Sequence, residues 1–178
     1  MTEKERTFLH VIGAIIVLPG TAVVLIPGIL VWQYGFEAPH PYDLRFWLAK
    51  PLIPGGLALA GWTAALFFIY GEGSPAPWHP PHRLVVRGPY KFVRNPMIAA
   101  VLMLLAAEAL LFNSDAIALW GVLFFVLNTL YFIYSEEPAL EQRFGDYYRL
   151  YTANVSRWLP RLSAWHPPWE DDPSCDED

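Results

Sequence analysis

The amino-acid sequence predicts an all-α membrane protein with about four transmembrane helices and a C-terminal cytoplasmic amphipathic helix. Two observations predict this class. Hydrophobic residues make up 54% of the 178 residues and charged residues only 16%, whereas soluble domains carry about 25% charged residues. The apolar residues are also gathered in four long stretches with few charges. A soluble helical bundle is therefore disfavoured, because its helices would need polar faces.

The first apolar span covers residues 8–34. No charged residue lies between Arg6 and Glu37, and the stretch is longer than the roughly 20 residues that cross a bilayer. Pro19 and Pro27 interrupt it, which a membrane helix tolerates when neighbouring groups satisfy the freed carbonyls. A signal peptide would have a shorter apolar region and a small-residue cleavage site. We therefore expect a retained transmembrane helix.

The other three spans are expected at residues 47–70, 97–112 and 117–134. Trp47 and Tyr70 flank the first of these three as interfacial aromatic residues do. Only a few residues separate the last two spans, so we expect them to form a tight antiparallel hairpin.

The basic residues predict the orientation of these spans. With both termini in the cytoplasm, only Arg45 and Lys50 of the 12 Lys and Arg residues lie on the other side, as the positive-inside rule prefers. We expect a multi-pass protein of a prokaryotic inner membrane, with both termini and the active site on the cytoplasmic side.

The net charge of −5 is an effect of the C-terminus, where acidic residues crowd the last few positions. We predict one domain over residues 1–166 and a disordered acidic tail over residues 167–178. Nothing in the charge pattern indicates a nucleic-acid partner.

The chain has one cysteine, Cys175, which lies in the tail, so an intrachain disulfide is excluded. His79 and His82 lie in a proline-rich loop without further ligands, so no metal site is expected.

Two cytoplasmic segments carry residues that a structural protein would not need. The first, residues 83–96, holds four basic residues and ends at Pro96, directly before the third span. Proline suits the first turn of a helix. Arg94 and Asn95 are therefore expected at a helix N-terminus, whose N–H groups favour a carboxylate or phosphate. The alternative is that the basic residues only anchor the loop to anionic lipid.

The second segment, residues 135–160, follows the fourth span. Apolar and aromatic residues recur at three- and four-residue steps from Leu140 to Tyr151, which predicts an amphipathic helix. Glu136 and Glu137 stand where this helix leaves the bilayer. They either form a favourable helix start or hold a cationic ligand, such as an ammonium or sulfonium group.

Both segments resemble motifs of one family. Residues 88–97 read Gly-Pro-Tyr-Lys-Phe-Val-Arg-Asn-Pro-Met. They resemble the "GPY..VR(H/N)P" motif of the integral-membrane methyltransferases related to isoprenylcysteine carboxyl methyltransferase and phospholipid N-methyltransferases. Residues 136–160 resemble that family's second motif, "EE..L...FG..Y..Y...V.RW.P". The two motifs flank a short hairpin, and the resemblance covers roughly residues 83–162.

The resemblance implies that S-adenosylmethionine is the methyl donor, bound in a cytoplasm-facing pocket between the hairpin and the C-terminal helix. The acceptor would be lipophilic and enter from the bilayer: an isoprenylcysteine-like carboxylate, a phospholipid amine, or a small hydrophobic thiol or amine. The resemblance makes Arg94 and Glu137 the catalytic candidates. The donor-binding candidates are Gly88, Pro89, Tyr90, Val93, Asn95, Pro96, Glu136, Tyr148, Arg157 and Trp158.

The chain departs from the family where a tyrosine and a glycine are common, at Ile98 and Ala100. The missing tyrosine removes a hydroxyl from the expected pocket and leaves the acceptor open. Glu108 lies inside the third span, where a carboxyl is costly and by default indicates a functional or pairing site. Ile98 and Glu108 are therefore the candidate acceptor contacts.

Two other functions stay open at this point. Some membrane sterol- or lipid-type reductases share a similar C-terminal hairpin architecture and use NADPH. A non-catalytic four-helix membrane scaffold would require neither Arg94 nor Glu137. Binding of S-adenosylhomocysteine or of NADPH distinguishes the enzyme classes.

Overall fold

A computed structural model of the protein describes residues 19–37, 39–70 and 84–168. All regular secondary structure in these residues is helical, which confirms the predicted all-α class for this part of the chain. The elements, in chain order, are η1 (Thr21–Leu25), α2 (Ile26–Tyr34), α3 (Leu44–Tyr70), η2 (Gly88–Lys91), α4 (Pro96–Leu111), α5 (Asp115–Tyr131), η3 (Phe132–Glu136), α6 (Glu137–Phe144) and α7 (Asp146–Asn154). His79, His82 and Cys175 lie outside the described residues, as does the predicted tail from residue 169 onward.

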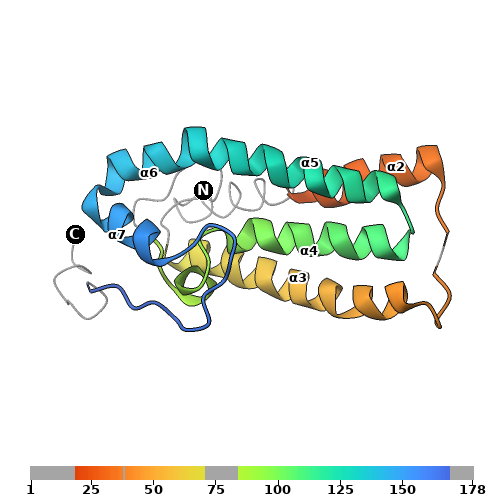
Figure 1. Ribbon diagram of the computed structural model, residues 1–178, viewed down its shortest axis with the longest axis horizontal. Helices are drawn as coiled ribbons and strands as arrows, with labels where there is room; N and C mark the ends of the chain where they lie inside the picture. The colour runs from red at the N-terminus through yellow and green to blue at the C-terminus, as the bar shows by residue number, and fades with distance from the viewer. Residues whose placement is uncertain (1–18, 38, 71–83, 169–178) are drawn as a thin grey trace, which may run out of the picture.

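The long helices lie side by side and run alternately in opposite directions (Figure 1). α3 packs along α4, α4 packs against α5, and the η1–α2 helix lies against α4 and α5. Ser114 caps the N-terminus of α5, because its Oγ accepts a hydrogen bond from the Ile117 N–H at 3.3 Å. The predicted tight hairpin between the third and fourth spans is therefore present as α4 and α5.

Within the described residues, one helix is long and apolar enough to cross a membrane: the continuous helix Asp115–Phe144. The η1–α2 helix and α4 are apolar but shorter. α3 begins at Leu44, three residues before the predicted span, and contains Pro51 and Pro54. Residues 8–18 of the first predicted span lie outside the described residues, and its remainder forms η1 and α2. The four-span topology remains a prediction.

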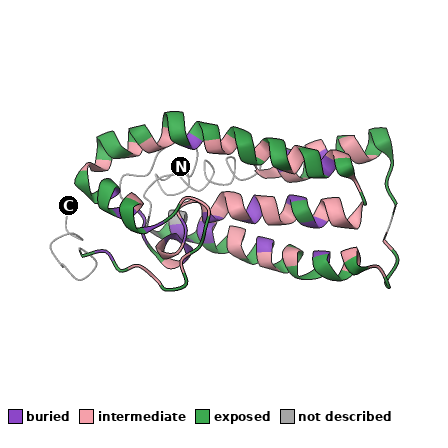
Figure 2. Cartoon of the chain, in the orientation of Figure 1, coloured by how far each residue is buried: buried purple, intermediate pink, exposed green. Residues whose placement is uncertain are grey.

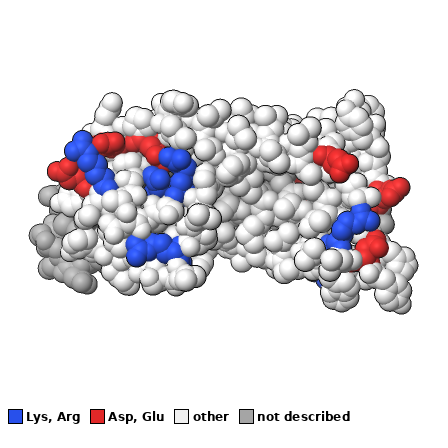
Figure 3. Space-filling model, in the orientation of Figure 1, with Lys and Arg blue, Asp and Glu red and all other residues white. Residues whose placement is uncertain are grey.

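The charged side chains lie at the two ends of the bundle, and the face shown in Figure 3 is uncharged between them. On the longest helix, the stretch 116–134 carries no charge. It spans about 28 Å at 1.5 Å per residue, close to the roughly 30 Å of a bilayer's hydrocarbon core. The outer face of α5 exposes apolar side chains, including Leu119, Val122 and Leu127 (Figure 2). This distribution is the one that a lipid environment favours.

The contact between α3 and α4 depends on small residues. A Cβ atom on Gly56 of α3 would lie 2.9 Å from Leu104 Cγ and 3.2 Å from the Ala100 carbonyl oxygen. Ala100 is fully buried in this contact. Gly56 therefore lets α3 approach α4 closely at Ala100 and Leu104.

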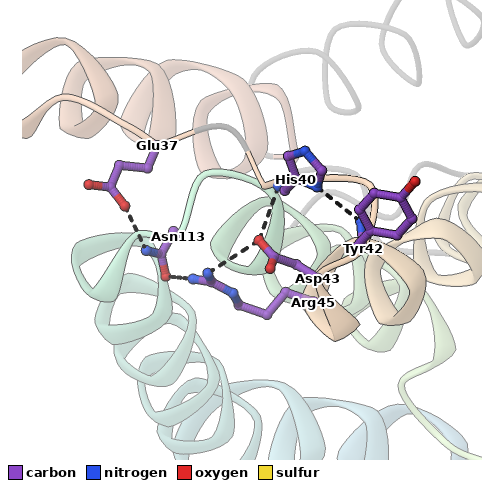
Figure 4. Close-up of polar contacts among 6 residues, drawn as sticks. All are labelled: Glu37, His40, Tyr42, Asp43, Arg45 and Asn113. Carbon is purple, nitrogen blue, oxygen red and sulfur yellow. Dashed lines mark hydrogen bonds and ion pairs between the residues drawn. The ribbon is translucent and has the colours of Figure 1, made fainter.

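A polar cluster joins three segments at the end of the bundle where α4 turns into α5 (Figure 4). Arg45, at the start of α3, donates a hydrogen bond to Asn113 Oδ1 in the α4–α5 turn. Its Nη2 also lies 3.6 Å from Asp43 Oδ2. Asn113 Nδ2 donates to Glu37 Oε2 at 3.4 Å. These contacts tie the segment after α2 to the α4–α5 hairpin.

The predicted C-terminal amphipathic helix is present in two pieces. α6 continues α5 through the π-helical turn η3, and α7 starts again after Gly145, where the chain changes direction (Figure 1). Gly145 has φ of +53°, a left-handed conformation that L-residues rarely adopt. The prediction of one unbroken helix was wrong, because apolar periodicity does not show this break.

Candidate active site

The candidate site lies at the end of the bundle where α4 begins. The continuous α5–α6 helix extends well beyond this point, and residues 84–95 are folded against the end of α3 (Figure 1). Gly88 forms the turn at the start of η2, with φ of +54°. A Cβ atom there would lie 3.0 Å from Leu66 Cδ1 and 3.1 Å from the Trp62 ring. Gly88 therefore lets this segment approach α3 closely.

Tyr90 and Tyr151 connect the two motifs through a buried contact. The Tyr151 hydroxyl donates a hydrogen bond to the Tyr90 carbonyl oxygen at 2.8 Å. Burial raises the pKa of both phenols above the ordinary value, so each remains protonated at neutral pH. Tyr151 also packs in one apolar cluster with Val86, Tyr148 and Val155.

Backbone hydrogen bonds hold the segment after α7 against residues 91–94. The Arg94 N–H donates to the Ser156 carbonyl at 3.0 Å, and the Arg161 N–H donates to the Phe92 carbonyl at 2.9 Å. The Trp165 N–H donates to the Lys91 carbonyl at 3.0 Å. The two motifs, far apart in sequence, thus form one structural unit.

Glu137 is the centre of the charged part of this unit. Arg157 binds both of its oxygens, with Nε 2.7 Å from Oε1 and Nη2 2.9 Å from Oε2. Arg94 Nη1 lies 3.1 Å from the same Oε1. The three side chains are only 12% (Arg94), 21% (Glu137) and 24% (Arg157) exposed. One carboxylate is therefore shared between two guanidinium groups at the edge of the bundle.

The Arg94 guanidinium forms an ion pair with Glu137, with Nη1 3.1 Å from Oε1. Nε and Nη1 of Arg94 are buried and make no hydrogen bond with the described residues. Buried donors of this kind normally have a partner. Arg94 is therefore able to accept an additional anionic ligand.

Glu136 and Tyr148 complete the polar surroundings. Among the residues that the structure describes, no cation pairs with Glu136, whose electrostatic neighbours are Glu137, Tyr90 and Tyr148. Burial, with a smaller effect of Glu137, raises the pKa of Tyr148 to about 12. Its hydroxyl therefore stays protonated beside Arg94. The turn η3, directly before Glu137, is π-helical, a deviation that often occurs at functional sites.

Trp158 lies on the apolar side of the site. Its ring is 5.0 Å from the Phe125 ring and 5.9 Å from the Phe132 ring, centroid to centroid. Its Nε1 is buried without a hydrogen-bond partner in the described part of the chain. Trp158 therefore packs along the long α5–α6 helix, which is the candidate membrane span, beside the charged cluster.

The structure brings together six of the fourteen residues singled out from sequence: Tyr90, Arg94, Glu136, Glu137, Tyr148 and Arg157. Pro89, Val93 and Pro96 are buried where η2 leads into α4. Asn95 is the N-cap of α4, although its side chain makes no capping hydrogen bond. Ile98 lies on the first turn of α4.

Glu108 is not part of this cluster. It lies ten residues after Ile98 on the same helix, about 15 Å away along the axis, towards the opposite end of the bundle. Its Oε2 is buried and makes no hydrogen bond with the described residues. The two candidate acceptor contacts, Ile98 and Glu108, therefore lie at different depths along α4.

The comparisons with known proteins agree with this arrangement. A family model described as phospholipid methyltransferase matches residues 51–147, more than half of the chain. The chain belongs to the phospholipid methyltransferase family. The resemblance stated from the two motifs is thereby confirmed, and family membership indicates a membrane methyltransferase.

The phospholipid methyltransferase match contains Arg94, Glu136 and Glu137 and ends before Tyr148 and Arg157. A 63-residue stretch is also 44% identical to an uncharacterized protein of Haemophilus influenzae. That stretch is 35% of this chain and 97% of the other protein.

Sequence reasoning missed two structural roles in this site. Tyr151 contributes to the periodicity of the predicted helix, but its hydrogen bond to the Tyr90 carbonyl spans 61 positions and has no local signal. Arg157 was expected to contact the donor, and the structure shows that its guanidinium is engaged by Glu137. An arginine following a tyrosine-rich helix is compatible with either role.

Proposed function

We propose that this protein transfers a methyl group from S-adenosylmethionine to a lipophilic acceptor at the cytoplasmic face of the membrane. The observation that carries the proposal is the Arg94–Glu137–Arg157 cluster, in which the buried Arg94 guanidinium has unused N–H groups. This cluster lies at the end of the apolar bundle, where a charged donor can meet a lipid-soluble acceptor.

The residues present fit the charges of the donor, which carries a carboxylate, an ammonium and a sulfonium group. Arg94 supplies buried N–H groups for the carboxylate, since charge-assisted hydrogen bonds of this kind are strong. Glu136 has no cationic partner among the described residues, and burial together with Glu137 raises its pKa to about 7. A bound ammonium would favour its charged form, so we assign it to that group. The faces of Tyr90 and Tyr148 attract cations such as the sulfonium.

The donor supplies an activated methyl group, and the protein contributes position and exclusion of water. Arg94 holds and orients the donor. Glu137 is engaged by Arg157 on both oxygens, so we assign it the role of orienting Arg94 rather than accepting a proton. Acceptors that suit this chemistry are an isoprenylcysteine-like carboxylate, a phospholipid amine, and a small hydrophobic thiol or amine.

The proposal includes the four-span topology with both termini in the cytoplasm. The charged ends and uncharged middle of the bundle support it. The basic residues support it as well, because all but Arg45 and Lys50 fall in the segments expected on the cytoplasmic side. Attachment of a cleavable tag to either terminus, followed by protease treatment of sealed inverted vesicles, tests this orientation.

Calorimetry on the detergent-purified protein tests donor binding. We expect S-adenosylhomocysteine to bind the wild type and NADPH not to bind. Arg94→Ala should abolish the binding, whereas the matched control Arg149→Ala should not, because Arg149 is exposed and pairs with Glu141 and Asp146 outside the site. Binding of NADPH alone would indicate a reductase instead. Unchanged binding in a folded Arg94→Ala protein would show that Arg94 does not bind the donor.

A further inference from the structure

The segment that follows α7 contacts the long α5–α6 helix within its uncharged stretch, and not at its charged end beside the site. The Trp158 ring lies between the rings of Phe125 and Phe132, at 5.0 Å and 5.9 Å. These phenylalanines are seven residues apart, about 10 Å along the helix axis. Both belong to the uncharged stretch 116–134 of this helix.

The depth of Trp158 follows from this geometry. A position midway between Phe125 and Phe132 is about 8 Å along the axis from Tyr134, the last residue of the uncharged stretch. Side chains on a helix also point back towards its N-terminus, which here is away from the end of the bundle that holds the candidate site. The uncharged stretch matches the thickness of the hydrocarbon core. Trp158 is therefore level with lipid chains and not with the headgroups.

The chain beside Trp158 is apolar and outward-facing. Leu159 is 78% exposed, and Leu162 is fully exposed. Pro160 between them has no N–H that would require a hydrogen-bond partner. The neighbouring outer face of the long helix is also apolar, with Val126 43% and Leu130 45% exposed. The exposed leucines therefore extend a surface that already suits lipid.

Lipid favours non-helical chain whose polar groups find partners within the protein, and the two ends of this segment have such partners. The Ser156 carbonyl accepts the Arg94 N–H, and the Arg161 N–H donates to the Phe92 carbonyl. The Arg157 guanidinium, next to Trp158, is paired with Glu137, and the Arg161 guanidinium donates to the Asn154 carbonyl. The segment is thus anchored on both sides of its apolar tip.

We propose that residues 156–162 form a re-entrant wedge, in which Trp158 packs on the long helix and Leu159 contacts the lipid chains of the leaflet on the site's side. The partner of this surface is the hydrocarbon of the bilayer. From the sequence we expected the same segment in the cytoplasm, because it contains Arg157 and Arg161.

Site-specific quenching tests the wedge without any substrate. Cys175 is the one cysteine of the chain, so Cys175→Ser gives a background for single labels. Leu159→Cys carries an environment-sensitive fluorophore, in vesicles of phosphatidylcholine and phosphatidylglycerol. Leu123→Cys, exposed on α5, is the lipid-facing control, and Ala153→Cys, exposed on α7, is the aqueous control.

The wedge predicts that nitroxide on the lipid acyl chains quenches the Leu159→Cys label as strongly as the Leu123→Cys label. Iodide in the buffer should quench only the Ala153→Cys label. Quenching of the Leu159→Cys label by iodide would overturn the proposal. Protection from both quenchers would overturn it as well, because the surface would then be covered by protein. Neither result depends on methyl transfer, so the wedge and the proposed function fail separately.

Discussion

Arg157 binds both carboxylate oxygens of Glu137, with Nε 2.7 Å from Oε1 and Nη2 2.9 Å from Oε2. This contact connects α6, the continuation of the candidate membrane span, to the segment after α7. The same carboxylate lies 3.1 Å from Arg94 Nη1. Arg157 therefore holds the carboxylate beside which the Arg94 guanidinium lies, although the two arginines are far apart in sequence.

Replacing Arg157 by lysine should weaken donor binding while keeping the charge. Lysine has no planar fork and cannot bind both oxygens in the same way, so Glu137 would no longer be held in one orientation. We expect about a tenfold loss of S-adenosylhomocysteine affinity, which corresponds to about 1.4 kcal/mol, and a larger loss for Arg157→Ala. Arg149→Lys is the control. Unchanged affinity in Arg157→Lys would show that the bidentate contact is irrelevant to the site.

Gly56→Ala should destabilise the contact between α3 and α4. The new Cβ would lie 2.9 Å from Leu104 Cγ, and overpacking of this kind costs about 1–3 kcal/mol. Gly61→Ala on the same helix is the control, because nothing lies within 4 Å of its Cβ position. Thermal unfolding in detergent should show a lower Tm for Gly56→Ala only. Equal Tm values for the two variants would argue against close packing here.

Tyr151→Phe should loosen the connection between the two motifs. The variant leaves the Tyr90 carbonyl without its 2.8 Å hydrogen bond, and an unsatisfied buried acceptor costs about 1–3 kcal/mol. The exposed Tyr134→Phe change should have no such effect. Denaturant unfolding measures both. The prediction fails if Tyr151→Phe is as stable as the wild type.

Alkaline pH should destabilise the site through Tyr148. Burial raises the pKa of this phenol to about 12, above the ordinary value of about 10. A pKa that is higher in the folded state gives stability that is complete below about pH 10 and is lost between about pH 10 and 12. Tyr148→Phe should lose less stability over this range. Circular dichroism measures the loss of structure, and tyrosinate absorbance measures the ionisation of the phenol. Ionisation of Tyr148 at the ordinary pKa of tyrosine, without loss of structure, would contradict the prediction.

Much of this site was predictable from the sequence because its parts are local. Pro96 marks the start of α4, and the two motifs contain Arg94 and Glu137, whose ion pair the structure shows. The helical class and the α4–α5 hairpin follow from the distribution of apolar residues. For the start of α4 and for the hairpin, a short stretch of sequence contains the whole physical reason, whereas Arg94 and Glu137 were identified from the resemblance to a family.

Other features depend on contacts or backbone angles that no local pattern contains. The positive φ of Gly145 divides the C-terminal helix into α6 and α7, and a glycine after a helical pattern does not by itself show the new direction. The depth of Trp158 depends on rings from α5 and η3. Both features result from tertiary packing that outweighs the local helical preference.

Methyl transfer is the most direct test of the central claim, that Arg94 and its carboxylate partner form the donor site of a membrane methyltransferase. Purified protein is incubated with S-adenosylmethionine labelled in its methyl group and with total membrane lipids. We predict label in a lipid-soluble product for the wild type and the Arg149→Ala control, and none for a folded Arg94→Ala protein. Equal labelling by wild type and Arg94→Ala, or no lipid-soluble label with any variant, would contradict the claim.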